Sequence, residues 1–425
     1  MSSLIDRSLT VFPAGSNGEF NLPPELSIVI RRGAGCRLWD TDDRPFYDFS
    51  MGWGSVLVGH ARDEVVAAVT EQAPLGSNFA YVNEKCLLLA EEIVRLSPAC
   101  DTVRFCASGT EATMYCQRLA RAFTGRPKIL KFEGAYHGAN EVGVTSLFPS
   151  KPAAYPRSDP TSAGVTRTMA DEVLVAPFND LEWTARILNE HAHELAAVIV
   201  EPLQRCVPPE PGFLEGLRRL TRDAGVLLIF DEVVTGFRLA YGGAQQYYGV
   251  VPDLVAYGKA LGGGYPIGAF GGRADVMQLV REDRLGTDDR YVWVASTLGG
   301  NPISTTAALA TLGVFQQAQV YERLHALGRY LRGGLLRVLQ RRGVEAQVIG
   351  DGPLAQVIFS TAPIRDYRTT QQGDSARGRR LMLELFRRGI FLNPMGTKLY
   401  LSIAHDEAVC DEFLNRFDDA LDTVV

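Results

Sequence analysis

Three charged residues stand where two neighbouring apolar runs end. Asp231 and Glu232 follow the run 226–230, which is typical of a buried central strand, and Lys259 follows the run 253–257 between Gly258 and small residues. Ligands of open α/β sheets bind at the carboxyl ends of the strands. The pattern therefore predicts a carboxylate and a nucleophilic amine at one ligand site.

Two further motifs have the same relation to predicted strands. Ser108, Gly109 and Thr110 lie where the strand-like run 102–106 turns into a helix, and free N–H groups with hydroxyls at a helix start form a cradle for a phosphate. Tyr136 and His137 follow the strand predicted at 128–131, where an aromatic ring can stack on a flat ligand.

Each motif alone has an ordinary structural explanation. A strand-end aspartate is often a helix cap, a single lysine is usually a solvated charge, and Ser-Gly-Thr is a common helix start. In combination they supply a phosphate cradle, a stacking ring, an acid for a ring nitrogen and an imine-forming lysine. Pyridoxal 5'-phosphate requires these groups, so the sequence predicts this cofactor.

Four segments carry a resemblance to a known family: SGTEATMYCQRLARAFTGRPKILKFEGAYHG, DEVVTGFR, GKALGGGYPIGAFGGR and TLGGNPISTTAALATL. They resemble the class III aminotransferases of fold type I, and within these the glutamate-1-semialdehyde 2,1-aminomutases. The similarity runs from about residue 35 to 405, with the motifs in the family's order. It implies a fold type I enzyme that depends on pyridoxal phosphate.

The resemblance also implies roles for individual residues. Lys259 is expected to form the Schiff base with the cofactor and to carry the proton, while Asp231 pairs with the pyridine nitrogen. Val233 and Tyr136 are expected to cover the two faces of the ring. The other cofactor contacts that it implies are Ser108, Gly109, Thr110, His137, Glu201, Gln204 and Thr297. Thr297 would reach the phosphate of the neighbouring subunit, which implies a homodimer with shared active sites.

The substrate side departs from the family pattern. In the stretch 13–21, Asn21 stands where the aminomutases have an arginine that clamps the substrate carboxylate. The stretch 395–398, ending at Lys398, replaces an acidic position. We expect Asn21, Lys398 and the pocket-wall aromatic Trp53 to face the substrate, although core packing explains Trp53 equally well. Arg31, Arg32 or Lys398 could bind a carboxylate, or each could be a solvated surface charge.

The predicted activity is a ping-pong aminotransfer from an amine, amino acid, amino sugar or aminocyclitol to a keto or aldehyde acceptor. The alternative is glutamate-1-semialdehyde 2,1-aminomutase or a related isomerase, which would need no external acceptor. A cofactor-binding regulator or an inactive subunit is a third hypothesis. The intact Lys259 argues against inactivity.

The elements that must position these residues form two patterns. Apolar runs at 172–176, 197–200, 226–230 and 254–257 alternate with helices at 179–191 and 212–223, which predicts an α/β domain with a doubly wound, mainly parallel sheet. A long helix at 303–341, strands at 355–359 and 399–403 and a helix at 375–388 predict a smaller α+β domain, joined by N-terminal strands at 28–30, 35–39 and 46–49. The expected division is 1–60 and 316–425 for the small domain and 61–315 for the cofactor-binding domain. The Pro- and Ser-rich stretch 146–167 reads as a loop or lid.

Composition excludes several other classes of protein. The 425 residues are 46% hydrophobic and 22% charged with a net charge of -6, and no cluster of positive charge suggests a nucleic-acid partner. No apolar run is long enough to span a membrane and the start lacks a secretory signal, so we expect a cytoplasmic protein. The seven scattered cysteines predict reduced thiols and no metal site.

Overall fold

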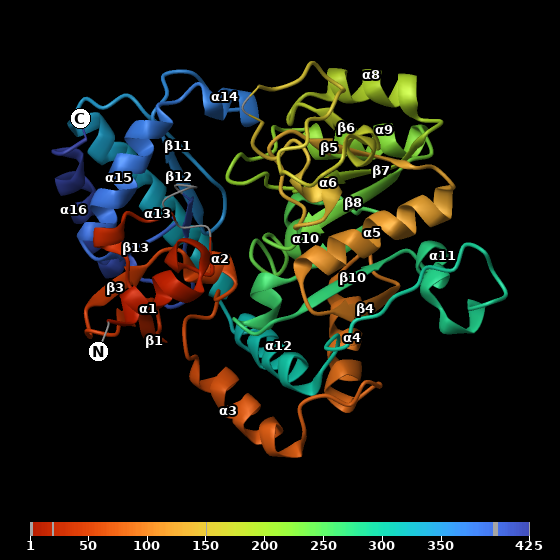
Figure 1. The fold of residues 1–425 in the computed structure, drawn as a ribbon, viewed down its shortest axis with the longest axis horizontal. Helices are drawn as coiled ribbons and strands as arrows, with labels where there is room; N and C mark the ends of the chain where they lie inside the picture. The colour runs from red at the N-terminus through yellow and green to blue at the C-terminus, as the bar shows by residue number, and fades with distance from the viewer. Residues whose placement is uncertain (1–2, 19–20, 150, 394–397, 425) are drawn as a thin grey trace. The chain divides into compact units, whose positions relative to one another are not determined.

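The computed structural model describes residues 3–18, 21–149, 151–393 and 398–424 (Figure 1). The chain divides into two compact units. The large unit comprises Glu64–Tyr321 and Arg365–Tyr367, and the small unit comprises Met1–Asp63, Glu322–Ile364 and Arg368–Val425. The chain thus changes unit a few residues after the expected boundaries, and a short return, Arg365–Tyr367, belongs to the large unit.

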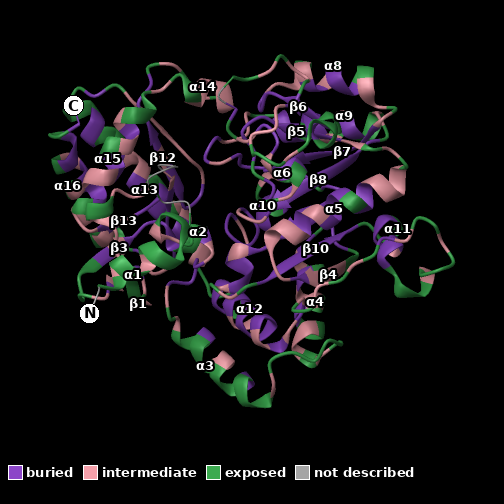
Figure 2. Ribbon diagram, in the orientation of Figure 1, coloured by how far each residue is buried: buried purple, intermediate pink, exposed green. Residues whose placement is uncertain are grey.

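The large unit contains a seven-stranded sheet in the order β4-β10-β9-β8-β7-β5-β6. Its strands are β4 (Thr102–Cys106), β5 (Lys128–Phe132), β6 (Val173–Ala176), β7 (Leu195–Val200), β8 (Leu227–Glu232), β9 (Leu254–Tyr257) and β10 (Gly268–Gly272). The pairs from β9 through β8, β7 and β5 to β6 are all parallel. Every residue of β6, β7, β8 and β9 is buried, as expected for a parallel sheet covered on both faces (Figure 2). The predicted α/β fold class is confirmed.

Strand β10 was not predicted, and it is the antiparallel member of the sheet, between β4 and β9. Its sequence, GAFGG, lacks the β-branched residues that mark a strand. The glycines are needed because the neighbouring backbone is close: a Cβ on Gly268 would lie 2.2 Å from the carbonyl oxygen of Ser108, and one on Gly272 would lie 2.4 Å from that of Asp253.

The large unit also contains several helices. They are α3 (Asp63–Gln72), α4 (Glu84–Leu96), α5 (Gly109–Thr124), α6 (Glu141–Val144), α7 (Arg167–Asp171), α8 (Leu181–His191), α9 (Phe213–Asp223), α10 (Gly243–Tyr248), α11 (Ala274–Met277) and α12 (Pro302–Phe315). Helix α5 lies along β4 and β7 to β10, and buries Ala112, Cys116 and Leu119 completely. This contact fixes the start of α5 at one edge of the sheet.

The long helix predicted at 303–341 is two helices, α12 and α13 (Val320–Arg341). Gln319 has a φ of 66°, in the left-handed region, so the chain changes direction between α12 and α13. The sequence there has no proline or glycine to signal the break. Helix α12 is buried nearly all round, whereas α13 is amphipathic, so the two have different surroundings.

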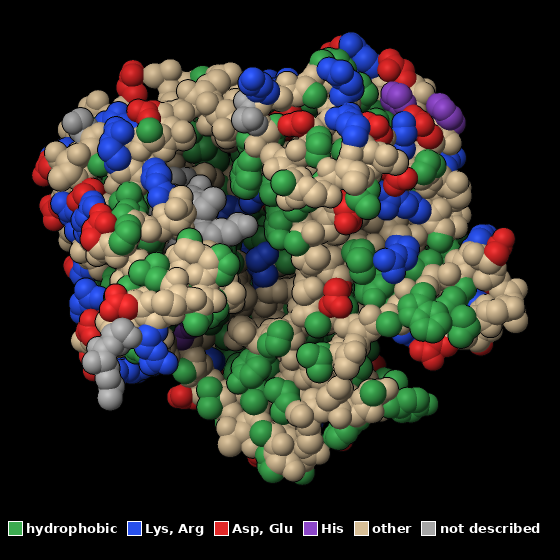
Figure 3. All heavy atoms as spheres, in the orientation of Figure 1, with side chains coloured by type: hydrophobic (Ala, Val, Ile, Leu, Met, Phe, Trp, Pro, Cys, Tyr) green, Lys and Arg blue, Asp and Glu red, His purple; other side chains and the backbone are tan. Residues whose placement is uncertain are grey.

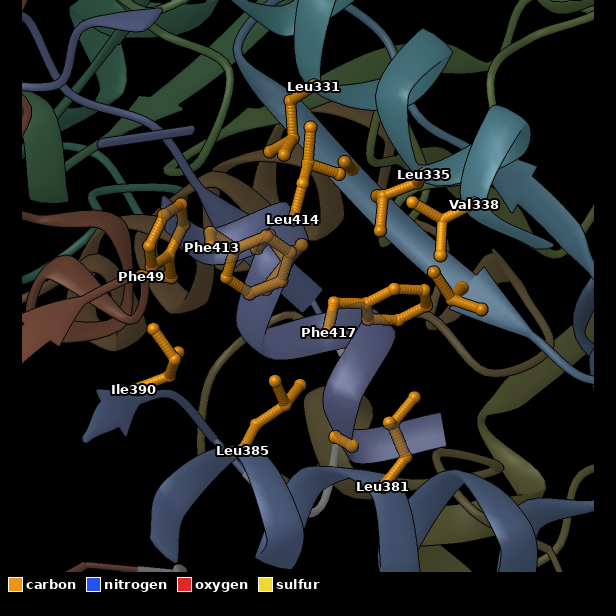
Figure 4. Close-up of a cluster of buried hydrophobic side chains, with 14 of the residues drawn as sticks. Phe49, Leu331, Leu335, Val338, Leu381, Leu385, Ile390, Phe413, Leu414 and Phe417 are labelled. Atoms are coloured by element: carbon orange, nitrogen blue, oxygen red, sulfur yellow. The ribbon is translucent and has the colours of Figure 1, made fainter. Parts of the chain in front are cut away.

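The small unit contains two sheets and a helical layer. The sheets are β1 (Ile30–Ala34), β2 (Arg37–Asp40), β3 (Pro45–Asp48) and β13 (Ile390–Phe391), and β11 (Gln347–Ile349), β12 (Leu354–Ile358) and β14 (Lys398–Tyr400). Its helices are α1 (Leu4–Val11), α2 (Met51–Gly54), most of α13, α14 (Tyr367–Gln371), α15 (Ser375–Arg387) and α16 (Glu407–Leu421). Phe413 and Phe417 of α16 pack with Leu331, Leu335 and Leu385 of α13 and α15 to form its core (Figure 4).

No helix among the described residues is long and apolar enough to cross a membrane. All seven cysteines are free, and six of them are buried, as predicted.

Candidate active site

The carboxyl ends of neighbouring strands meet at one edge of the large sheet. Strand register pairs Asp231 with Ala256 and Glu232 with Tyr257, which sets the end of β8 beside the end of β9. Lys259 follows β9 directly, and Glu201 follows the last residue of β7. The structure therefore brings together strand ends that are far apart in the sequence.

Asp231 is a buried carboxylate held by two donors. Its Oδ2 lies 2.7 Å from Nδ1 of His137, and its Oδ1 accepts the Val233 N–H at 3.1 Å. A carboxylate only accepts, so Nδ1 of His137 carries the shared proton. His137 is completely buried, and within the described chain its Nε2 has no hydrogen-bond partner. The imidazole thus fixes the orientation of Asp231.

Lys259 begins a short 3-10 turn, Lys259–Gly262, in an uncommon backbone conformation. Its φ is 42°, the left-handed region that non-glycine residues rarely occupy. Such strain persists where surrounding structure enforces it and is frequent at functional sites. The residue is partly exposed between the buried Gly258 and Ala260. The backbone of Lys259 is therefore held in one conformation directly after β9.

Two glycines make room beside the Val233 side chain. A Cβ on Gly109 would lie 2.8 Å from Cγ1 of Val233, and one on Gly258 would lie 3.4 Å from the same atom and 3.5 Å from Cα of Gly109. The start of α5, the end of β8 and the end of β9 therefore converge on one small space. Larger residues at Gly109 would fill it.

The start of α5 has its own internal bonds. The Ser108 hydroxyl accepts the Glu111 N–H at 3.2 Å, and the Thr110 hydroxyl accepts the Ala139 N–H at 3.2 Å. Both hydroxyls thus accept hydrogen bonds from nearby backbone N–H groups. The sequence had instead predicted that they face an anion. The first N–H groups of a helix have no intrahelical acceptor, so those of Gly109 and Thr110 remain suited to a phosphate.

The turn after β5 carries Tyr136 and is tied to the end of β7. The Tyr136 N–H donates to Oε1 of Glu201 at 2.8 Å, and Nε2 of Gln204 donates to the Glu133 carbonyl at 2.7 Å. Tyr136 is 38% exposed, so part of its ring is open. Oε1 of Gln204 is buried without a partner among the described residues.

Sequence reasoning missed Lys131, which anchors the same turn. Its Nζ is completely buried and donates to the carbonyls of Ala135 (2.9 Å), Val142 (3.1 Å), Gly143 (3.1 Å) and Thr145 (2.7 Å). The pKa of Lys131 is lowered to about 7, mainly by burial and in smaller part by the nearby Arg205, while Glu201 and Asp231 oppose the shift. A lysine inside the apolar run KILKF was the available signal.

Arg205 was also missed. It lies in the turn after Glu201, and its Nε donates to the Gly134 carbonyl at 3.0 Å. The guanidinium carbon lies 5.2 Å from the ring centroid of Phe148 and 5.9 Å from that of Tyr136. A cation thus stands beside the open ring of the predicted site.

The other predicted contacts belong to other segments of the chain. Thr297 is exposed in the large unit, where its carbonyl accepts from Asn78 at 3.1 Å. Asn21, Trp53 and Lys398 belong to the small unit. Asn21 is exposed and its carbonyl accepts from Arg379, Trp53 is 39% exposed with a φ of 57°, and Lys398 lies 5.7 Å from the Tyr400 ring. Met395, Gly396 and Thr397, the rest of the replaced acidic position, lie outside the described residues.

The alternative carboxylate ligands Arg31 and Arg32 are exposed and have other partners. Arg31 lies 3.4 Å from the Asp43 carboxylate, and Arg32 stacks 3.7 Å from the centroid of Trp39. Both have the character of surface charges.

Comparison with known proteins places the chain among enzymes of one family. The family model described as aminotransferase class-III matches residues 21–421. The chain is 41% identical to glutamate-1-semialdehyde 2,1-aminomutase from Thermomicrobium roseum, over 99% of this chain and 97% of that protein. A solved omega-transaminase from Sphaerobacter thermophilus superposes with a TM-score of 0.92 at 36% identity, covering 99% of this chain and 96% of that one. A solved transaminase with PLP bound has a TM-score of 0.88 and 29% identity, with coverage of 99% and 96%.

Proposed function

The chain belongs to the class III aminotransferases, which are pyridoxal-phosphate-dependent enzymes of fold type I, and on that premise we propose that it transfers an amino group between an amino donor and a keto or aldehyde acceptor. The observation that carries the proposal is the convergence of the His137–Asp231 pair, Lys259 and the start of α5 at one sheet edge. The substrates are small molecules with an amine or a carbonyl group.

The residues present fit pyridoxal phosphate. Glycine at 109 lets the start of α5 lie close against Val233, since a Cβ there would lie 2.8 Å from Cγ1. The start of the 16-residue helix α5 offers N–H groups to a phosphate, and Tyr136 has an open ring. When bound, the cofactor supplies an electron sink for breaking bonds next to the substrate nitrogen.

The chain's own residues then have separate tasks. Asp231, oriented by His137, would hold a positive charge at the ring nitrogen, because a buried carboxylate strongly favours a cationic partner. Lys259 would bind the cofactor, be released by the substrate amine and move the proton at the substrate's α-carbon. Gln204, whose Oε1 lacks a partner among the described residues, would accept a hydrogen bond from the phenolic hydroxyl, and Glu201 would hold Tyr136 in place.

An aminomutase is the second candidate, because the chain is 41% identical to one over nearly its full length. Asn21 in place of the expected arginine favours an aminotransferase with another substrate. Both reactions would use Lys259 and Asp231. They differ in whether turnover requires a separate carbonyl acceptor.

We also propose a homodimer. Exposed apolar side chains gather in the large unit around the segment between α3 and α4 and the segment that carries Thr297, in the lower part of the view (Figure 3). They are Leu75, Phe79, Tyr81, Val82, Leu87, Leu88, Trp293 and Leu298, which we call the apolar face. Asn78 and Asn83 join its two parts through the carbonyls of Thr297 and Gly300. A second copy covering this face would bring Thr297 to the subunit boundary. The free thiols fit a cytoplasmic enzyme.

The test is a half-reaction screen on the enzyme loaded with pyridoxal phosphate. Amines, β-amino acids, amino sugars and aminocyclitols are added singly without an acceptor, and loss of the cofactor's visible absorbance band reports amino transfer. Lys259→Ala, which cannot form the lysine-linked band, is the blank. A donor that bleaches the band, and an acceptor that restores it, support the aminotransferase.

The same enzyme is then incubated with glutamate 1-semialdehyde alone. Efficient formation of 5-aminolevulinate without any acceptor would identify the aminomutase instead. A loaded enzyme whose spectrum no donor or semialdehyde changes would contradict both catalytic proposals.

A further inference from the structure

We propose that Arg205 recognises a carboxylate of the substrate, so that the enzyme's substrates include amino acids rather than simple amines only. This inference rests on the proposed function, because it assigns a substrate group to the same site. It names a residue that neither the family motifs nor the substrate-side positions Asn21 and Lys398 suggested.

The backbone at Arg205 is held in a conformation that few arginines adopt. Its φ is 60°, in the left-handed region that residues other than glycine rarely adopt. The Arg205 N–H donates to Oε2 of Glu201 at 3.2 Å, and the adjacent Gln204 pairs with Val207 in an isolated bridge. The turn thus fixes the direction in which the side chain leaves β7. Strain of this kind is typical of sites where a side chain must be presented in one orientation.

The guanidinium has unused donors. Of its five N–H groups, the Nε–H donates to the Gly134 carbonyl, while Nη2 is buried and has no hydrogen-bond partner among the described residues. None of the ion pairs found in the described chain involves Arg205. A partly buried guanidinium without a carboxylate is costly unless a ligand provides one.

The neighbours of Arg205 suit an amino acid. Tyr136 and Phe148, which are 38% and 54% exposed, lie on the guanidinium at 5.9 Å and 5.2 Å from their centroids. Cation–π contacts of this kind leave the N–H groups of the guanidinium available for a carboxylate. Because Tyr136 is the ring proposed to cover the cofactor, an anion bound to Arg205 lies next to the reacting amine.

The electrostatic surroundings of Arg205 contain both signs of charge. Burial is the main cause that lowers the pKa of Lys131, Arg205 lowers it too, and Glu201 and Asp231 raise it. Glu201 accepts the main-chain N–H groups of Tyr136 and Arg205. A substrate carboxylate would add the negative charge that these cations favour.

Two reagents that attack the cofactor in any loaded enzyme of this class test the proposal without knowledge of the natural substrate. Aminooxyacetate and O-methylhydroxylamine each displace the Lys259 amine from the cofactor carbon, with no oxidation or reduction, and only aminooxyacetate carries a carboxylate. Second-order rates are measured from loss of the visible band for the wild type, Arg205→Gln, Arg205→Lys and Arg222→Gln. The exposed Arg222 on α9 is the matched control.

We expect Arg205→Gln to slow aminooxyacetate by about 10- to 100-fold, the loss of one charge-assisted hydrogen-bonded pair, and to leave O-methylhydroxylamine within about twofold. Arg205→Lys keeps the charge without the fork, so its loss is smaller. 3-Aminooxypropionate is measured alongside, because its carboxylate lies one methylene group farther from the aminooxy nitrogen. Equilibrium binding of glutarate, followed by calorimetry on the loaded enzyme, is expected to weaken in the same variants.

The role of Arg205 would be overturned if Arg205→Gln slowed aminooxyacetate and O-methylhydroxylamine equally. It would also be overturned if neither aminooxyacetate nor 3-aminooxypropionate changed its rate relative to O-methylhydroxylamine. That result leaves the aminotransferase intact, since O-methylhydroxylamine still reacts. A wild type without a visible band, or one inert to O-methylhydroxylamine, would instead contradict the proposed function. Arg205→Gln that loses the band altogether is replaced by Arg205→Lys, whose rate ratio then decides.

Discussion

Lys131 and Asp231 are buried charges that the protein stabilises in different ways. Asp231 has a histidine and a backbone N–H, whereas Lys131 has only carbonyl oxygens. The carbonyls come from both ends of the stretch 135–145, which carries Tyr136 and His137. A single ammonium therefore closes the turn that presents the ring and the imidazole.

Replacing Lys131 should show this role. Lys131→Met leaves four buried carbonyls without their donor, and we expect it to lower the free energy of unfolding by about 3 kcal/mol and to weaken cofactor binding. Urea unfolding and titration with pyridoxal phosphate measure the two effects. Lys128→Met is the matched control, because Lys128 begins the same strand in a half-exposed ion pair with Glu194 and should cost less than about 1 kcal/mol. Equal effects of the two variants would contradict the anchoring role.

At the scale of elements, the start of α5 is coupled to two strand ends through glycine. Gly109 faces Val233 closely enough that any side chain collides with it, while the helix itself is capped by Ser108. Gly109 therefore determines how closely the start of α5 approaches Val233 at the proposed cofactor site. The cap also explains why Ser108 is a poorer phosphate ligand than its backbone neighbours.

Gly109→Ala is expected to weaken binding of pyridoxal phosphate about tenfold or more, because the new Cβ would lie 2.8 Å from Val233. The affinity is measured by fluorescence quenching during titration. Gly313→Ala is the control: it lies in α12 with open space around the new Cβ, so cofactor affinity should stay the same and helix propensity should add up to about 1 kcal/mol of stability. If Gly109→Ala bound the cofactor as well as the wild type, the glycine cradle would be wrong.

At the scale of the whole molecule, each unit has its own core, and the small unit contains a buried histidine. His405 accepts the Ser402 N–H at Nδ1 (3.1 Å) and donates from Nε2 to the Asp48 carbonyl (3.1 Å), so it is neutral. Burial lowers the pKa of His405 to about 4 from 6.5. Between these values the unfolded chain binds the additional proton, so stability decreases as the pH falls.

We therefore expect the small unit to lose up to about 3 kcal/mol between pH 6.5 and pH 4 through this residue. Urea midpoints measured across that range by circular dichroism report the change. His405→Asn should start less stable and lack this part of the pH dependence. An identical slope in the two proteins would show that His405 does not titrate in this range.

The apolar face makes a prediction about assembly. Leu298, 52% exposed, lies next to Thr297, and Leu298→Asp would place a charge in the proposed subunit boundary. We expect this variant to sediment as a monomer and to lose activity. Leu336→Asp, a change of an exposed leucine on α13 of the small unit, should leave the dimer unchanged. A wild type that is monomeric at working concentration would refute the dimer.

The sequence by itself determined the fold class, the cofactor and the buried strands of this protein. Apolar runs that end before Asp231, Glu201 and Gly258-Lys259 mark these strands, since local hydrophobicity is enough to reveal them. The same reasoning predicted the parallel sheet and the helices α8, α9 and α15. It failed at β10, where glycine is required because the backbone of neighbouring segments lies close. It also failed at the break between α12 and α13, which no proline or glycine marks.

Only the tertiary structure decided the surroundings of those residues. Arg205 meets Phe148, and Gln204 meets Glu133, across separations that no spacing rule connects. Lys131 resembles a solvated charge until four carbonyls from a later turn surround it. Long-range contacts determine whether a buried polar group has a hydrogen-bond partner. A cation that keeps an unused donor, as Arg205 does, is the one proposed to bind a substrate.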